Sequence, residues 1–475
     1  MASENANPYK TVDATPVKSF FVHMLTRDIR LEDAILDLLD NCVDGILRPK
    51  GAVQRPRGLH PYNGFWAEIK FDGTSFSIAD NCGGIPWDLH KYAFRMGRDP
   101  SRPPDEPGTV GVYGIGMKRA IFKLGTECLI TTKNGDDAYE VDVPAGWMQN
   151  ETDWSFPAMP AKRPMKHDGT TIVVGALHPW ISERFHEETE EFGARLERMI
   201  ATHYAAIINK GFEVSVNKVS VKPRPIKLLF TENARKKKQT DGIKPFMFRT
   251  KTDGVEVFLA VGFTRPIPSL DEVENEQSEK RYSSEDAGWT IVCNDRVVVY
   301  CDRTELTGWG EANVPRYHTQ FIAISGIVEF SGEASKLPTT TTKRDVDASS
   351  ALYLQVKNKM REGMRIFTDY TNKWKTRADE SKKQMVAGTP LSFEEIKVQA
   401  TKLDFTASKT SVPPGGQYKP VLPVPKKLES HNRRISFVKT KEEVQTVGEH
   451  LLGEADADPS TVGEACFDAF LKEAR

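Results

Sequence analysis

The clearest pattern of hydrophobic and polar positions runs from residue 31 to residue 46. Apolar residues recur there at steps of three and four, which places them along one face of a helix. They are Leu31, Ala34, Ile35, Leu38, Leu39, Cys42 and Ile46. Because such a face packs against a core, the pattern predicts a long amphipathic helix at 31–46.

Alternating patterns after this helix predict strands. Apolar residues alternate over 66–78 around an Asp-Gly turn, and over 139–143 after an Asn-Gly turn, as they do in β-hairpins. Another apolar strand is expected at 171–174. Residues 95–116 are rich in Gly, Pro and Asp, which indicates a long loop.

From about residue 195 to residue 345 the pattern mixes helix and strand. The helix is expected at 192–208 and the strands at 212–221, 255–263, 289–300 and 321–330. Two charged runs interrupt this block: an acidic one at 271–279, and a basic one of Arg235, Lys236, Lys237 and Lys238. Runs of like charge are usually solvated, so both are interpreted as surface loops. The basic run is nevertheless where DNA contact would be sought.

The carboxy-terminal part begins with a long helix whose apolar residues step by three or four. They are Tyr353, Val356, Met360, Met364, Phe367, Tyr370 and Trp374. Core packing is the simpler interpretation of this stripe, and a dimer or partner seam is the alternative. The pattern is then lost in a Pro- and Gly-containing stretch, as in linkers. From Ile435 a short strand and two helices, 441–452 and 459–474, are expected.

This organisation divides the chain into five parts. They are residues 1–190, 191–350, 351–402, a linker at 403–430 and a small module at 431–475. No internal repeat is evident.

Composition narrows the function classes. Of the 475 residues, 65 are Lys or Arg and 66 are Asp or Glu, so the net charge of −1 gives no global attraction to nucleic acid. No apolar run approaches the ~18–20 residues of a membrane span. The first ten residues lack the features of a secretory signal. The net charge and the absence of such an apolar run together predict no membrane partner. The six cysteines lie far apart, without metal-binding spacing, which favours reduced thiols in a cytoplasmic compartment.

The first candidate motif lies on the helix at 31–46. Asp37, Asn41 and Asp44 are spaced by four and three, so they share one stripe. A carboxylate and a carboxamide one turn apart can hold Mg²⁺ and an attacking water, because hard cations take oxygen ligands. The alternative is that these residues simply form the solvated face of the helix.

The second motif follows the strand that ends at Asp80. A carboxylate at this place can accept a hydrogen bond from an exocyclic amine. The paired glycines, Gly83 and Gly84, let the backbone approach a flat ring. A tight turn without a ligand is the alternative.

The third motif is a glycine loop that leads into a helix at 117–124. Its glycines are Gly111, Gly114 and Gly116, and Lys118 follows them. Exposed amides at a helix start bind phosphate, and a lysine adds a point charge. The spacing is neither that of a Walker loop nor that of a dinucleotide fingerprint. A glycine-rich turn is the alternative.

Taken in order, these motifs and an Asp-Gly-Thr at 168–170 resemble the GHKL ATPase superfamily. That superfamily contains gyrase-type topoisomerases, MutL, histidine kinases and the ninety-kilodalton heat-shock chaperone. The lid sequence Gly-Val-Tyr-Gly-Ile-Gly-Met-Lys at 111–118 looks most like the chaperone and MORC branch. The resemblance implies an α+β protein: an α/β sandwich ATPase domain, a βαβ-type transducer domain and a small α-rich module.

The resemblance also assigns roles to single residues. Asp80 matches the aspartate that reads the adenine amine, with Gly84 beside it, and Thr170 matches the supporting threonine. Asn41 matches the Mg²⁺-coordinating asparagine. The lid residues Gly111, Gly114, Gly116 and Lys118 match those that enclose the phosphates. In the threonine-rich loop at 337–344, Lys343 matches the lysine that reaches the γ-phosphate.

Two residues depart from the family pattern. The general base is usually Glu, four residues before the asparagine, and that position holds Asp37, which is one methylene shorter. General-base help worth roughly 10²–10⁴-fold is therefore in question. Cys82 stands where the first glycine of the Asp-x-Gly-x-Gly pattern is expected.

The resemblance implies a slow, Mg²⁺-dependent ATPase clamp that dimerises on binding ATP and acts on DNA or a protein partner. Because Asp37 replaces Glu, a nucleotide switch with negligible hydrolysis that regulates a partner effector stays open. A histidine kinase is less favoured, since no phosphoacceptor-histidine helix is evident upstream. The module at 431–475 is a candidate site for recruiting an effector.

Overall fold

The computed structural model describes residues 17–47, 60–97, 108–111, 114–163, 165–231, 242–279, 286–340, 343–385, 388–408, 414–425 and 435–475. The chain divides into two compact units, Met1–Pro425 and Lys426–Arg475. Three parts of the expected site lie outside the described residues: the basic run Arg235–Lys238, lid residues 112–113 and loop residues 341–342.

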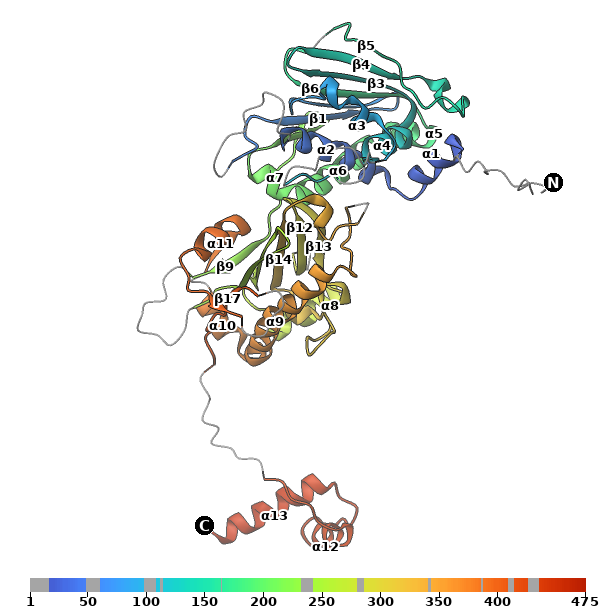
Figure 1. The fold of residues 1–475 in the computed structure, drawn as a ribbon. Helices are drawn as coiled ribbons and strands as arrows, with labels where there is room; N and C mark the ends of the chain where they lie inside the picture. Colours follow the sequence, from blue (N-terminus) through green and yellow to red (C-terminus); the bar gives the residue numbers. More distant parts are fainter. Residues whose placement is uncertain are drawn as a thin grey trace, which may run out of the picture. The chain divides into compact units, whose positions relative to one another are not determined.

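Eight strands of the first unit form its first sheet, in the order β5-β4-β3-β6-β2-β1-β7-β8 (Figure 1). They are β1 (Trp66–Phe71), β2 (Phe76–Asp80), β3 (Gly125–Asn134), β4 (Asp137–Val143), β5 (Ala158–Pro160), β6 (Gly169–Leu177), β7 (Glu213–Val216) and β8 (Val219–Ser220). Neighbours are antiparallel except β1 and β7, which are parallel. Both predicted hairpins, β1–β2 and β3–β4, are confirmed.

Helices cover one face of this sheet. They are α1 (Lys18–Arg27), α2 (Leu31–Leu47), α3 (His90–Phe94), α4 (Gly116–Leu124), α5 (Pro179–Glu187), α6 (Thr189–His203) and α7 (Ala205–Asn209). Apolar side chains of α2, α4, α5 and α6 share one core with the inward-facing residues of the strands. The alternation of buried and half-buried residues along β2 fits a sheet with one covered face. The helix expected at 192–208 is two helices, broken at Tyr204.

This sheet and its core include β7, β8 and Val221. The boundary expected at residue 190 therefore falls inside the first layer, by which we mean the first sheet and the helices that cover it. The reason is that β7, which follows this boundary, pairs with β1.

Seven strands form the second sheet, in the order β13-β12-β14-β11-β10-β17-β16. They are β10 (Phe246–Thr252), β11 (Val255–Phe263), β12 (Gly288–Cys293), β13 (Arg296–Asp302), β14 (Ile324–Ser331), β16 (Thr406–Ala407) and β17 (Gly416–Tyr418). Only the β12–β14 pair is parallel. The strand expected at 289–300 is in fact the β12–β13 hairpin.

Both faces of the second sheet are covered, so β12 and β14 are buried along nearly their whole length. The long helix α9 (Ala351–Trp374) packs on one face. All seven residues of its apolar stripe are buried in that core, which confirms the core-packing interpretation. The strand pair β9 (Lys227–Phe230) and β15 (Thr389–Ser392) packs on the other face with α11 (Phe393–Ala400). The short helix α10 (Ala378–Met385) follows α9 in the chain.

Three local predictions are wrong. The acidic run 271–279 lies in a helix, α8 (Leu270–Glu279), because Ser269 and Glu272 cap its start reciprocally. The expected linker contributes β16 and β17 to the edge of the second sheet. The short strand expected from Ile435 is not formed, since residues 435–440 have no regular structure.

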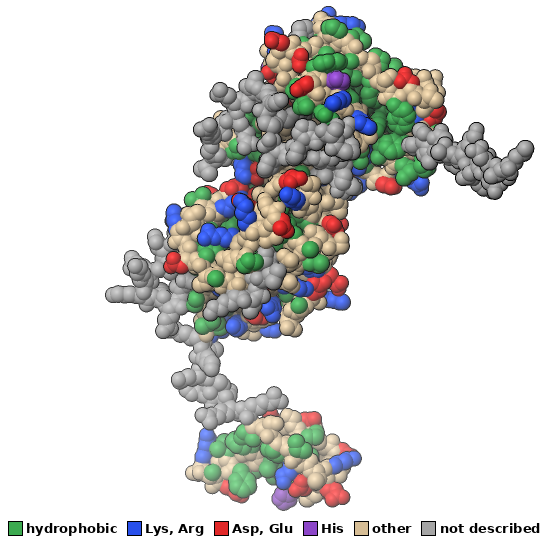
Figure 2. Space-filling view, in the orientation of Figure 1, with side chains coloured by type: hydrophobic (Ala, Val, Ile, Leu, Met, Phe, Trp, Pro, Cys, Tyr) green, Lys and Arg blue, Asp and Glu red, His purple; other side chains and the backbone are tan. Residues whose placement is uncertain are grey.

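The second unit is a helix pair, α12 (Lys441–Leu452) and α13 (Pro459–Glu473), close to the predicted bounds. Thr440 and Glu443 form a capping box, and Gly453 ends α12 in the left-handed conformation. Within the two helices only Gly448 and Val462 are buried. Figure 2 shows hydrophobic side chains on the visible face of this unit, and Phe437, Val438, Phe467 and Phe470 are exposed. Two helices of this size cannot bury their own apolar residues.

Among the described helices, none combines the length and the apolar character that crossing a bilayer requires.

Candidate functional site

Four polar residues share one face of α2: Asp37, Asp40, Asn41 and Asp44. The alternative interpretation expected this face to be exposed to solvent, but in the structure it is covered. The side chains of Asp37 and Asp40 are 4% and 1% exposed. The face is covered by α4 from the first layer and by side chains of the second sheet, so its carboxylates need charged partners.

Those partners complete what we call the lid-side cluster: Asp37, Asp40, Arg119, Arg296 and Lys343. The Nζ atom of Lys343 lies 2.8 Å from Oδ2 of Asp40 and 3.6 Å from Oδ1 of Asp37. Nε of Arg296 lies 3.0 Å from Oδ1 of Asp40, and Nη2 of Arg119 pairs with Oδ2 of Asp37. Every side chain of the cluster is at most 10% exposed.

The opposite charges keep these groups ionised despite their burial. Burial raises the pKa of Asp40, but Lys343 and Arg296 outweigh it and hold that pKa below its ordinary value. Burial lowers the pKa of Lys343, but Asp40, Asp37 and Asp44 outweigh it and raise that pKa. Lys343 is therefore a fully charged lysine shared by carboxylates of α2.

Asp44 fixes the start of the glycine loop. Its Oδ1 and Oδ2 accept hydrogen bonds from the backbone N–H groups of Val110 (2.6 Å) and Gly111 (2.8 Å). A Cβ added at Gly111 would lie 2.7 Å from Oδ2 of Asp44, so a larger residue there would displace the carboxylate that holds the loop. Burial raises the pKa of Asp44, although these backbone donors oppose the shift.

The second sheet also contacts this part of the loop. Nδ2 of Asn294 donates to the carbonyl oxygens of Thr109 (2.8 Å) and Gly332 (2.9 Å). The N–H of Gly108 donates to Gly332 O at 3.2 Å. Residues 108–111 at the start of the loop are therefore bonded to α2 on one side and to the second sheet on the other.

The loop ends at α4, whose first residue is Gly116. Gly114 has φ +66°, and a Cβ added at Gly116 would lie 3.3 Å from Cγ of Asp37. Lys118 is buried and donates from Nζ to Ala93 O at 2.9 Å. In this arrangement the predicted phosphate lysine of the lid points into the protein.

The other end of the site is built around Asp80. Its Oδ1 accepts the N–H groups of Cys82 (2.8 Å) and Thr170 (3.3 Å), and its Oδ2 accepts the thiol of Cys42 (3.4 Å). Oγ1 of Thr170 lies 3.2 Å from Oγ1 of Thr132. The two predicted adenine residues, Asp80 and Thr170, are thus brought together.

The turn after Asp80 accommodates Cys82 in place of glycine. The left-handed conformations fall on the next two residues, Gly83 (φ +94°) and Gly84 (φ +65°). A Cβ at Gly84 would lie 2.0 Å from Lys133 O, so only glycine fits there. Cys82 is buried and needs no unusual backbone, which resolves the departure noted in the sequence.

The β12–β13 turn connects the second sheet to the first layer through three consecutive residues. Asn294 and Asp295 both have positive φ, as in the tight turns of hairpins. Asn294 bonds to the start of the loop, and Arg296 pairs with Asp40 in the lid-side cluster. Asp295 accepts a hydrogen bond from the hydroxyl of Tyr62 at 2.9 Å.

Asp295 also belongs to a second group, which we call the sheet-side cluster: Asp295, Glu329, Glu394, Lys210 and Lys397. One carboxylate oxygen from each acid lies within 4.8 Å of the others, a spacing that could hold a metal ion. Two lysines pair with these three acids instead. Lys210 lies 2.5 Å from Asp295 and 3.3 Å from Glu394, and Lys397 pairs with Glu329 and lies 3.5 Å from Glu394.

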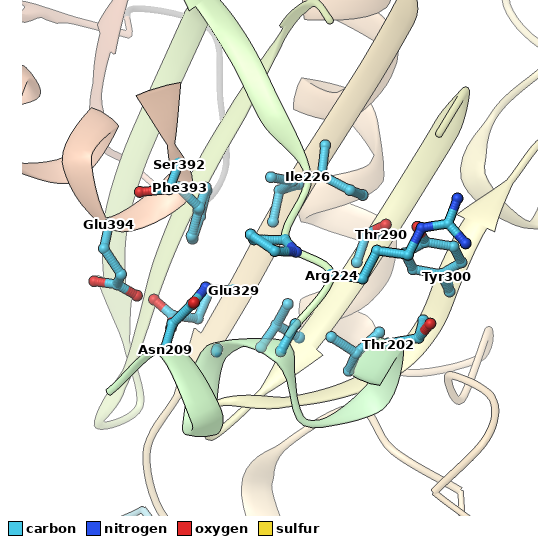
Figure 3. Close-up of a pocket in the computed structure, with 16 residues that line it drawn as sticks. Thr202, Asn209, Arg224, Ile226, Thr290, Tyr300, Glu329, Ser392, Phe393 and Glu394 are labelled. Atoms are coloured by element: carbon cyan, nitrogen blue, oxygen red, sulfur yellow. The ribbon is translucent and has the colours of Figure 1, made fainter. Parts of the chain in front are cut away.

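A cavity of about 60 Å³ adjoins this cluster (Figure 3). Glu329 and Glu394 line it, together with Arg224 and Tyr300 and mostly apolar residues of α7, the second sheet and α11. Ligand pockets commonly measure 300–1,000 Å³, so this cavity is too small for a nucleotide.

The structure places the predicted site residues in two groups: Asp80 with Thr170 at one end, and the carboxylates of α2 with the glycine loop and Lys343 at the other. Sequence reasoning missed Asp40, Arg119 and Arg296. Asp40 has a signal, since it shares a helix face with Asp37 and Asn41. Arg296 has none, because it pairs with a residue 256 positions away.

A comparison with models of known families finds a match over part of the chain. Residues 29–169 match the family model described as histidine kinase-, DNA gyrase B-, and HSP90-like ATPase. The match contains Asp37, Asn41, Asp80 and the glycine loop, and it ends at the first residue of β6, before Thr170 and Lys343. A comparison with curated proteins finds no match.

Proposed function

Residues 29–169 are a GHKL-type ATPase domain, and on this premise we propose that the protein is an ATP-dependent switch that hydrolyses ATP slowly with Mg²⁺. Binding of nucleotide would be sensed by Lys343 and transmitted to the second sheet. Hydrolysis, assisted by Asp37, would reset the switch.

The position of Lys343 carries this proposal. Lys343 follows β14 of the second sheet in the chain, but its side chain pairs with Asp40 and Asp37 on α2. A γ-phosphate carries more negative charge than a shared carboxylate, so it competes for the same ammonium group. Exchange of Lys343 from carboxylate to phosphate would shift the population of states in favour of the closed one.

Departure of Lys343 would leave Oδ1 of Asp37 available as the general base for ATP hydrolysis. The oxygen of a water forms a bond to the γ-phosphorus while the bond from that phosphorus to the bridging oxygen of ADP breaks. The electron pair goes to ADP, and the proton of the water goes to Asp37 and then to solvent.

The donor set at Asn41 fits Mg²⁺. Its Nδ2 is buried and makes no hydrogen bond to any described residue. Its amide oxygen is a ligand that hard cations prefer. When bound, the ion would neutralise charge on the phosphates, and Asp80 with Thr170 would bind the adenine.

Dimerisation on ATP binding is supported by α1. Val17, Phe20 and Met24 follow one another at steps of three and four, and all three are exposed. This apolar stripe on the first helix offers a second copy a surface to cover. Contact with DNA through Arg235, Lys236, Lys237 and Lys238, or with an effector through the exposed apolar residues of α13, remains part of the proposal.

A second candidate is a switch with negligible hydrolysis. It is favoured by the pairing of the short Asp37 side chain with Arg119, because this pair occupies one oxygen of the general base.

The test combines phosphate release in Mg²⁺-ATP with the size of the protein in a non-hydrolysable ATP analogue. We expect turnover to fall by about 10²–10⁴-fold in Asp37→Ala, the usual contribution of a general base. Asn41→Ala should lose Mg²⁺-dependent nucleotide binding. Glu187→Ala, which changes an exposed carboxylate on α5, is the control.

Turnover lost in Asp37→Ala with analogue-dependent dimers in the wild type supports the ATPase switch. Dimers without turnover in the wild type support the second candidate. Absence of nucleotide binding in the wild type rejects both.

A further inference from the structure

The proposed ATPase switch gives no role to two cations of the lid-side cluster, Arg119 on α4 and Arg296 on β13, and of these Arg119 is the one that pairs with Asp37. Its side chain is 7% exposed, and its Nη2 pairs with Oδ2 of Asp37. Its Nε is buried and makes no hydrogen bond to any described residue. Burying a guanidinium on a single carboxylate oxygen costs stability, because other hydrogen bonds do not fully compensate the lost hydration.

The two oxygens of Asp37 are engaged differently. Oδ2 belongs to Arg119, whereas Oδ1 faces Nζ of Lys343 at 3.6 Å, which is beyond hydrogen-bond distance. Lys343 lies closer to Asp40, at 2.8 Å. Departure of Lys343 would therefore free Oδ1 and leave Oδ2 paired with Arg119.

The backbone of α4 supports the same arrangement. A Cβ added at Gly116 would lie 3.3 Å from Cγ and 3.4 Å from Cβ of Asp37. The helix start thus packs directly against the carboxylate, and Arg119, one turn further along α4, completes the contact.

We infer that Arg119 is the positioning residue for Asp37: by pairing with Oδ2, it directs Oδ1 toward the place that Lys343 vacates. An aspartate reaches less far than the glutamate usual in this family, so its orientation matters more. This inference rests on the proposed function, because it requires Asp37 to act as the base.

The experiment uses the full-length protein and measures kcat for Mg²⁺-ATP and, separately, the affinity for a non-hydrolysable ATP analogue with Mg²⁺. Arg119→Gln should lower kcat by about 10–100-fold, the common cost of removing a residue that orients a catalytic ligand. Its analogue affinity should stay within about twofold, and Arg119→Lys should recover part of kcat because it keeps the charge. Arg195→Gln is the matched control, since Arg195 pairs with Glu32 on the same helix, α2, at 3.1 Å.

A double-mutant cycle separates positioning from other roles. In an Asp37→Asn background, Arg119→Gln should cause no further loss of kcat. An equal further loss, or an unchanged kcat in Arg119→Gln alone, overturns the inference. So does a large loss of analogue affinity, which would make Arg119 a phosphate ligand.

Failure of the proposed function gives a different result. Wild-type turnover that survives in Asp37→Asn rejects Asp37 as the base, and the positioning role with it. A thermal melt with the analogue present shows whether each variant is folded and binds nucleotide.

Discussion

The two charge clusters of the first unit, one buried on the lid side and one partly buried on the sheet side, differ in the sign of their excess charge. The lid-side cluster has three cations and two carboxylates, and the sheet-side cluster has three carboxylates and two lysines. Consecutive residues of one turn enter the two clusters: Asp295 joins the sheet-side cluster and Arg296 the lid-side cluster. A single hairpin thus anchors the second sheet in both.

Under the proposed function, the difference would separate a cluster that exchanges partners from one that holds the two sheets together. Among its ion-paired side chains the lid-side cluster has one cation more than it has carboxylates. Two buried polar atoms there have no partner among the described residues, Nδ2 of Asn41 and Nε of Arg119. An anionic ligand would satisfy both deficits. The sheet-side acids are paired with lysines, and Tyr62 also donates to Asp295.

The pKa values of one titratable group at each cluster reflect the opposite signs of the excess charge. Burial and the charge of Arg296 lower the pKa of His203 to about 4. Burial and the charge of Asp295 raise the pKa of Glu329, against the opposing effect of Lys397. The lid-side cluster therefore favours neutral His203, whose protonation would add positive charge. The sheet-side cluster favours neutral Glu329, whose ionisation adds negative charge.

The largest effect is expected from breaking the anchor at Arg296. Its side chain and that of Asp40 are 2% and 1% exposed, so Arg296→Met leaves a buried carboxylate with one cation fewer. We expect a loss of about 3–5 kcal/mol in the free energy of unfolding. All eight tryptophans lie before residue 426, so tryptophan fluorescence during urea denaturation measures the first unit.

The control for Arg296→Met is Lys251→Met, which removes an exposed pair with Glu256 and should leave the denaturation midpoint nearly unchanged. A loss below about 1 kcal/mol in Arg296→Met would mean that Lys343 alone compensates Asp40. The Arg296–Asp40 pair could then no longer be distinguished, as an anchor, from the Lys343–Asp40 pair that is proposed to exchange.

A smaller effect is expected from acidification, through His203. Because its pKa falls from 6.5 to about 4 on folding, its neutral form stabilises the fold above pH 6.5. That contribution, about 3 kcal/mol at ~1.4 kcal/mol for each pKa unit, is lost as the pH falls from 6.5 toward 4. His203→Gln should show a shallower loss of stability over this window in the same denaturation assay. Equal pH dependence of the two proteins would show that His203 is not the group responsible.

The contrast between the clusters also explains what the sequence could and could not reveal. The steps of three and four that place Asp37 and Asn41 on one helix face are local, and so are the glycines of the loop. The anchor of Arg296 on Asp40 and the pair of Lys343 with Asp40 join residues 256 and 303 positions apart. No local pattern encodes such pairs. Only the family resemblance pointed to Lys343, and nothing pointed to Arg296.

Solvation was the hardest property to infer. The stripe of Asp37 and Asn41 has the composition of a solvated face, but the second sheet covers it. The acidic run at 271–279 has the composition of a loop, but the caps at Ser269 and Glu272 give a helix start. In both cases a tertiary or capping contact outweighed the compositional tendency.

The smallest effect is expected in the sheet-side cluster, from Glu329→Gln. Because the pKa of Glu329 is raised on folding, its ionised form costs stability at neutral pH, and this cost falls as the pH decreases. The amide keeps the shape and removes the excess negative charge, so the variant should gain up to about 1 kcal/mol at pH 7. The gain should shrink as the pH is lowered toward 5, and ATP turnover should not change. A destabilised Glu329→Gln would instead show that the Lys397 pair outweighs the excess charge, so that both clusters would depend on their ion pairs in the same way.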